Sequence, residues 1–346
     1  MSNRNSIIIR LVIWGAIALF LLSALLMLLT RTVSGKNAWN TTLWGDLRTV
    51  QEESFSLDAI DELEFDFSSM DISVILTQED ELQVKLLANR ELRPEERFVS
   101  SLDNGRVVVK SQPQVDFFSL WTLNGFKRLE VYLPEQYQDA IQVSTASGNI
   151  TLPETLNLNT VTLHLSSGDL RGGSVSAGQL DLGVTSGNIT LSSVNSGRYS
   201  FIISSGDTTI EALEGTGSIG SSSGNIRIGS VKGGAQEIGS TSGNITLGQF
   251  QANGQISTQS GDIKMENVLP GGDVNVRVTS GRVSIDLAKE AAVNLQADVT
   301  SGDVRSTLPL SFDQDGKHAN GQIGANPGAT LSIRTTSGDI LLSQAE

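Results

Sequence analysis

The chain has 346 residues, with 35 glycines, three tyrosines and no cysteine, and 38 acidic against 24 basic residues give it a formal net charge of −14. The lack of cysteine excludes a disulfide framework, a thiolate metal site and a cysteine nucleophile, and two histidines are too few for a multi-histidine metal centre. This acidity repels phosphate backbones, so no nucleic-acid partner is expected. The apolar fraction of 38% is enough for a packed core, which excludes a disordered polyanion. No residue pattern predicts a cofactor or a metal.

The first 30 residues predict a membrane anchor. Residues 11–29 carry no charge, and with the isoleucines at 7–9 the apolar stretch reaches the roughly 20 residues that cross a bilayer. A cleaved signal peptide is the alternative, but its apolar part is about 7–15 residues long and a small-residue cleavage site follows it. The residues from Thr30 to Val33 make a poor site of that kind. We therefore expect residues 1–30 to be an uncleaved transmembrane helix that contacts the membrane through residues 7–29.

The charges that flank this stretch are nearly balanced. Arg4 and Arg10 precede it, and Arg31 and Lys36 follow it. Acidic residues carry little topological weight, so the acidic residues further on do not decide the orientation. We expect a single-pass protein of the cell membrane with its N-terminus in the cytoplasm and the rest of the chain extracytoplasmic. Residues 31–48 are predicted to be a tether.

From about residue 140 the sequence repeats itself. The tripeptide Ser-Gly-(Asn/Asp) recurs ten times, at steps of 18 to 21 residues and one final step of 36, and Arg282 once replaces the Asn or Asp. The long step predicts one degenerate copy at Asn320-Gly321. The ten glycines are Gly148, Gly168, Gly187, Gly206, Gly224, Gly243, Gly261, Gly281, Gly302 and Gly338.

Apolar residues keep fixed positions relative to each of these glycines. Ile189 and Ile226 lie two residues after a glycine, Phe201 lies five before one, and Val194 lies seven after one. Apolar and polar residues alternate around them, which is the pattern of β-strands with one buried face. The period predicts an all-β fold, a parallel β-helix or solenoid of about 19-residue, three-stranded coils. The ten glycines are expected to be structural corners, because glycine adopts positive φ at little cost.

Residues 49–139 are predicted to form an irregular N-terminal part of the same solenoid, and residues 140–346 its regular repeat. Met70 takes the place of the corner glycine in a drifted first copy. The last coil of a solenoid exposes unpaired backbone and an open core. The irregular region is expected to cover one such end.

The strand that ends at Leu133-Pro134, followed by repeated Ser-Gly-Asn-Ile-Thr-Leu units, resembles the bacterial adhesin-like family of unknown function known as the toastrack family. The resemblance covers about residues 55–344. It implies a β-solenoid domain attached to a membrane helix, with some members accompanying envelope-stress systems, and it brings no catalytic residues. We expect a non-enzymatic extracytoplasmic binding or scaffolding protein of the bacterial cell envelope, whose partner is an envelope protein or a glycan.

Two other functions stay open. A polysaccharide-cleaving enzyme is the main alternative, because such enzymes occur on parallel β-helices and use carboxylates about 5–10 Å apart. Asp262, Arg282 and Asp303 are predicted to occupy consecutive corners and are the best candidates. The competing interpretation is a solvated ladder of polar corners in which no two aspartates are neighbours. A self-assembling surface filament is the third function.

Four aromatic residues depart from the polar surface. Phe117, Phe118, Trp121 and Phe126 lie within ten residues of one another. They predict either a plug for the open end of the solenoid or a hydrophobic contact for a partner or for the outer face of the membrane.

Overall fold

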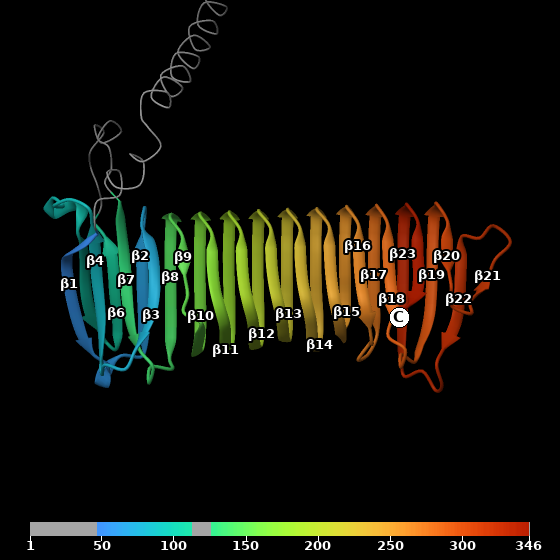
Figure 1. Cartoon of the computed structure of the whole chain (residues 1–346), viewed down its shortest axis with the longest axis horizontal. Coiled ribbons are helices and arrows are strands. Elements are labelled where there is room, and N and C mark those ends of the chain that lie inside the picture. Colours follow the sequence, from blue (N-terminus) through green and yellow to red (C-terminus); the bar gives the residue numbers. More distant parts are fainter. Residues whose placement is uncertain (1–46, 113–125, 346) are drawn as a thin grey trace, which may run out of the picture. The chain divides into compact units, whose positions relative to one another are not determined.

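The computed structural model describes residues 47–112 and 126–345. The described residues of its compact unit, Thr49–Glu346, form strands and two short 3-10 helices, η1 (Leu57–Ala59) and η2 (Pro94–Glu96) (Figure 1). The expected transmembrane helix and most of the tether lie outside the described residues. Among the residues that are described, no helix is long and apolar enough to cross a membrane.

The central part of the chain winds into stacked coils, each hydrogen-bonded in parallel to the next. Between two corner tripeptides the chain forms one continuous strand of 16 or 17 residues, which bends around the core in place of the three separate strands expected. The strands of this part are β8 (Ala140–Ser147), β9 (Ile150–Thr151), β10 (Thr155–Ser167), β11 (Leu170–Ser186), β12 (Ile189–Ser205), β13 (Thr208–Ser223), β14 (Ile226–Ser242) and β15 (Ile245–Ser260).

The core lies inside the coils. Alternate residues of each strand point inward, so every coil contributes apolar side chains to one continuous core. Full burial of a side chain of this size stabilises the fold by about 1.5–3 kcal/mol. In β12 the inward apolar residues are all 1% exposed or less, and they are Ile189, Leu191, Val194, Tyr199, Phe201 and Ile203.

From β11 to β15 the coil length varies between 18 and 19 residues because of register shifts at a second corner, which lies between Ser196 and Tyr199 in β12. Ser196 and Tyr199 of β12 pair with Gly215 and Gly217 of β13, so β13 has one residue fewer at this corner. Gly215 has a φ of 135°, and an added Cβ there would lie 1.8 Å from the carbonyl oxygen of Ser196. The 18-residue steps in the sequence mark the coils that lack this residue.

The coils near the C-terminus do not stack in sequence order. Strand β23 pairs in parallel with both β17 and β19, and β24 pairs with both β18 and β20. The last coil of the sequence is therefore inserted between two earlier coils, and its darker red is visible between their orange strands (Figure 1). These strands are β16 (Ile263–Val268), β17 (Val274–Ser280), β18 (Val283–Leu287), β19 (Val293–Ser301), β20 (Val304–Ser306), β23 (Ala329–Ser337) and β24 (Ile340–Gln344).

A hairpin of β21 (Ser311–Phe312) and β22 (His318–Ile323) follows the outermost of these coils. Strand β22 runs antiparallel to β19, with Gly321 opposite Leu295. The predicted degenerate repeat at Asn320-Gly321 is therefore wrong, because this segment is an end strand and forms no corner. The antiparallel strand covers the edge that the last parallel strand would otherwise expose.

The N-terminal end shows the same kind of inversion. Strand β2 (Glu62–Phe67) lies between β8 and β6 (Arg106–Ser111), and β3 (Asp71–Thr77) pairs with both β9 and β7 (Lys127–Pro134). Two antiparallel strands, β4 (Glu81–Ala88) on β7 and β5 (Phe98–Asp103) on β6, lie outside them. Strand β1 (Arg48–Ser56) pairs with β4.

Candidate functional site

The ten corner glycines form one row along the column. All ten have positive φ, between 129° and 158°. An added Cβ at Gly187 would lie 1.8 Å from the carbonyl oxygen of Gly168, so a larger residue does not fit between the coils. Met70 lies in the same row, and its backbone N–H donates to the carbonyl of Ser147 at 2.9 Å. The row is a structural element of the coil.

The residue after each glycine adds a ladder of hydrogen bonds. Oδ1 of Asn188 accepts from the backbone N–H of Asp207 at 3.0 Å, and Oδ1 of Asp207 accepts from that of Asn225 at 2.8 Å. The same bond recurs from Asp71 at one end of the column to Asp339 at the other. The bond from Asn225 is the main reason why the pKa of Asp207 is lowered. These amides and carboxylates are engaged in joining the coils.

The candidate enzyme site is assembled only in part, because Arg282 follows Asp262 in the row of corners but Asp303 does not follow Arg282. Oδ1 of Asp339 accepts from the backbone N–H of Asp303 at 3.1 Å, and Asp339, not Asp303, follows Arg282 in the row. The prediction that Asp262, Arg282 and Asp303 occupy consecutive corners is wrong, and so is the prediction that no two aspartates are neighbours. Corner tripeptides of equal sequence pair equally well with any other copy, so their order along the chain does not fix their order in the column. In the described part of the chain, no group of three His, Asp or Glu side chains is placed to hold a metal ion.

Only one member of the aromatic cluster is described. Phe126 lies just before β7 and is 48% exposed. Phe117, Phe118 and Trp121 lie outside the described residues. The plug and the partner contact both stay predictions.

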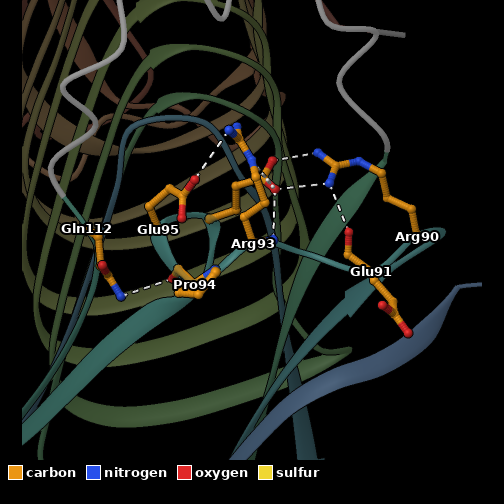
Figure 2. Close-up of polar contacts among 7 residues, drawn as sticks. Arg90, Glu91, Arg93, Pro94, Glu95 and Gln112 are labelled. Carbon is orange, nitrogen blue, oxygen red and sulfur yellow. Dashed lines mark hydrogen bonds and ion pairs between the residues drawn. The ribbon is translucent and has the colours of Figure 1, made fainter.

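The charged segment at 90–97 is held by the carboxylate of Glu96. The side chain of Glu96 is only 5% exposed, and Nη1 of Arg90 donates to its Oε2 at 3.0 Å. The backbone N–H of Arg93 donates to the same oxygen at 3.0 Å. The side chains of Arg90 and Arg93, both labelled in Figure 2, donate to this carboxylate. These contacts, with Arg90 the largest cause, lower the pKa of Glu96 to about 2.

A groove of about 890 Å³ runs along one outer face of the column, across the strands. Its floor is formed where Gly220 of β13 and Gly239 of β14 lie opposite each other, followed by Ser257 of β15. One wall is a row of exposed polar side chains, most of them hydroxyls, each two residues before a corner glycine. We call this surface the hydroxyl groove, and the hydroxyls of its wall belong to Ser204, Ser222, Thr241, Thr279, Thr336 and Thr300.

The backbone does not require glycine on this floor. Neither Gly220 nor Gly239 has positive φ. An added Cβ would come no closer than 3.9 Å to another atom at Gly220 and 3.5 Å at Gly239, which are ordinary contacts. Glycine inside a strand lowers stability by about 0.5–1 kcal/mol relative to alanine. Such a glycine often marks a place where a ligand approaches the backbone closely.

The two ends of the groove differ in chemistry. At one end Ile202 is 68% exposed. At the other end Arg277 of β17 lies opposite Arg334 of β23, and Asp298 of β19 lies beyond Arg334. Asp298 is shared, since its Oδ2 lies 3.5 Å from Nε of Arg334 and its Oδ1 lies 2.8 Å from Nδ1 of His318. The contact with Asp298 is the main reason why the pKa of His318 is raised.

No pattern in the sequence predicted this groove. Its floor could have been noticed as glycines four residues before a corner glycine, a position that the structure places on the outer face. Its basic end could not be found, because Arg277 and Arg334 are neighbours only through the insertion of β23.

Comparison with protein families identifies the fold. The family model described as Toastrack DUF4097 matches residues 60–232 and 216–343, which is most of the chain. The chain belongs to the toastrack family. The expected toastrack β-solenoid is thereby confirmed. No curated protein matches this toastrack chain.

Three solved structures are similar to this toastrack protein at low sequence identity. A putative adhesin from Parabacteroides merdae is 11% identical with a TM-score of 0.42, over 86% of this chain and 96% of that one. A putative cell adhesion protein from Clostridium sporogenes is 14% identical with a TM-score of 0.22, over 86% of this chain and 100% of that one. A putative lipid binding protein from Parabacteroides distasonis is 12% identical with a TM-score of 0.41, over 84% and 96%.

Proposed function

We propose that this toastrack protein is a non-enzymatic, adhesin-like binding or scaffolding protein of the bacterial cell envelope. In this proposal residues 7–29 anchor it in the cell membrane and the β column lies outside the cytoplasm. The hydroxyl groove is the observation that carries the binding role. Neighbouring strands are about 4.8 Å apart, so the groove offers hydroxyl groups at regular intervals to an extended ligand.

Within the hydroxyl groove, the position of the acidic groups supports binding over catalysis. Glycan cleavage uses two carboxylates about 5–10 Å apart that flank the scissile bond. The acidic residues that line the groove are Glu237 on β14 and Asp298 on β19. Four strand steps separate these strands, which corresponds to about 19 Å. Both oxygens of Asp298 are also in contact with Arg334 and His318.

The binding role can be tested with the full chain in detergent micelles and with purified cell-wall and surface polysaccharides. We expect the wild-type protein to sediment with its ligand and to release no sugar. Gly239→Val fills the floor of the groove and should abolish binding. Thr190→Val changes an exposed residue on the strand arm that follows a corner, outside the groove, and should bind like the wild type.

Two results would contradict parts of this proposal. Sustained sugar release that Asp303→Asn abolishes would establish the enzyme instead. Unchanged binding by the Gly239→Val protein would remove the groove as the binding surface.

The orientation is tested on intact cells. Protease added from outside should degrade the β column in the absence of detergent. Protection of the column until the cells are lysed would place it in the cytoplasm and contradict the proposal.

A further inference from the structure

The basic end of the groove carries a charge that the fold leaves uncompensated. Arg277 and Arg334 are directly opposite each other on adjacent parallel strands, and like charges at such a pair destabilise a sheet. Oδ2 of Asp298 lies 3.5 Å from Nε of Arg334 and offsets the charge of this arginine. Within residues 47–112 and 126–345, no carboxylate lies within 4 Å of Arg277, whose side chain is exposed. Fold stability therefore does not explain this arginine pair.

Fold stability also does not explain the glycines on the floor of the groove. Gly220 and Gly239 also lower the stability of their strands, and their backbone conformation and surroundings would accept a side chain. Uncompensated charge and missing side chains thus occur in one groove. Each feature costs stability in the free protein, and each provides what a ligand needs, an ionic contact and room close to the backbone.

We propose that the hydroxyl groove binds an acidic polysaccharide whose carboxylates contact Arg277 and Arg334, an inference that rests on the proposed binding function. The planar guanidinium of arginine matches a carboxylate with two parallel hydrogen bonds. The wall from Ser222 to Thr300 supplies hydroxyls that donate to and accept from sugar hydroxyls. The exposed side chain of Ile202 supplies an apolar contact for the C–H face of a sugar ring.

The net charge of the protein limits how such a ligand binds. The formal charge of −14 repels a polyanion at long range. At physiological ionic strength, charges more than about 8 Å apart are largely screened, so the contacts inside the groove decide the affinity. Binding is therefore expected at 0.15 M salt and should weaken when the salt is diluted, because dilution extends the repulsion.

The test measures affinity for three probes by isothermal titration with the full chain in detergent micelles. Polygalacturonate oligomers carry both hydroxyls and carboxylates, their methyl esters carry the same sugars without the charge, and polyphosphate carries charge without sugars. We expect polygalacturonate to bind best. Arg277→Gln should weaken its binding about 10-fold or more, because a hydrogen bond to a charged group contributes about 1.5–3 kcal/mol.

Arg198→Gln is the matched control. It removes the same formal charge from an exposed arginine that does not line the hydroxyl groove, and it should bind like the wild type. Thermal unfolding provides a readout that separates binding from structure. Arg277→Gln should melt at the same temperature as the wild type or higher, since it removes a like-charge pair.

Three outcomes would overturn the inference. Equal binding of the methyl ester, or equal losses with Arg277→Gln and Arg198→Gln, would show that the ligand charge is not recognised here. Equal or tighter binding of polyphosphate would show an anion site without preference for a polysaccharide. In each case, sedimentation of the wild-type protein with envelope polysaccharide that Gly239→Val abolishes would leave the proposed function standing, whereas a wild-type protein that does not sediment with any of them would remove the function itself.

Discussion

The backbone N–H of Asp303 donates to the side chain of Asp339 at 3.1 Å, although a full hairpin lies between these two residues in the sequence. This bond marks the place where the last coil of the chain lies between two earlier coils. The insertion has a functional consequence. It brings Arg334 beside Arg277 and Asp298, and so completes the basic end of the hydroxyl groove.

The corner ladder predicts a loss of stability in Asn188→Ala. The variant removes the acceptor for the N–H of Asp207 and the amide that donates to Asp169 at 3.2 Å. A hydrogen bond contributes about 0.5–1.5 kcal/mol net, so we expect the free energy of unfolding in urea to fall by about 1–2 kcal/mol. Asn195→Ala, at an exposed strand position outside the ladder, should change it by less than about 0.5 kcal/mol. Equal stability of the two variants would contradict the ladder.

A buried hydrogen bond at the second corner gives another prediction. The hydroxyl of Tyr199 donates to Oε1 of Gln236, and Nε2 of Gln236 donates to the carbonyl of Gly215 at 2.8 Å. Both side chains are almost fully buried, and burial raises the pKa of Tyr199. Tyr199→Phe leaves Oε1 of Gln236 without its donor, so the free energy of unfolding should fall by about 1–3 kcal/mol.

A double-mutant cycle shows whether this loss of stability comes from the hydrogen bond between Tyr199 and Gln236. In the background of Gln236→Leu, Tyr199→Phe should cost much less, because the acceptor is already gone. An equal cost in both backgrounds would mean that the tyrosine acts through packing alone.

The low pKa of Glu96 predicts a defined acid sensitivity. The folded-state pKa of about 2 lies below the ordinary value of about 4.3. The ionised carboxylate therefore adds stability above pH 4.3, and this contribution is lost as the pH falls toward 2. Glu96→Gln should lower the melting temperature at pH 7, and its difference from the wild type should shrink between pH 4.5 and pH 2.

Glu95→Gln is the control for that titration. Its side chain is 44% exposed and forms an ion pair with Arg93 at 3.2 Å, so the variant should melt close to the wild type throughout. A difference between Glu96→Gln and the wild type that stays constant from pH 7 to pH 2 would contradict the assigned pKa.

The coil itself could be predicted from the sequence because its determinants are local. Positive φ at Gly187 and the alternation around Phe201 follow from residue types at fixed spacing. The order of the coils could not be predicted in the same way. Backbone pairing is independent of sequence. The backbone N–H of Gly281 donates to the carbonyl of Ser337, so the coil of Gly338 lies where sequence order would have placed the coil of Gly302.

Most of the candidate site was beyond prediction for the same reason. Gly220 and Gly239 each lie four residues before a corner glycine, but only the structure shows that this position is on the outer face and accepts a side chain. The pair of Arg277 and Arg334 depends on the inserted coil. The expected charge run through Asp262, Arg282 and Asp303 failed because it assumed that sequence neighbours are also neighbours in the column.

The most direct test of the account is disulfide trapping of the inserted coil, which the absence of native cysteine allows. Thr336 lies on the strand between those of Thr279 and Thr300. Adjacent strands are about 4.8 Å apart, within the Cα range of a disulfide, whereas strands two steps apart are about 9.6 Å apart and exceed it. Under mild oxidation, mass spectrometry should find a disulfide in Thr279→Cys/Thr336→Cys and none in Thr279→Cys/Thr300→Cys. A disulfide in the second variant and none in the first would show that the coils stack in sequence order and that the basic end of the groove does not exist.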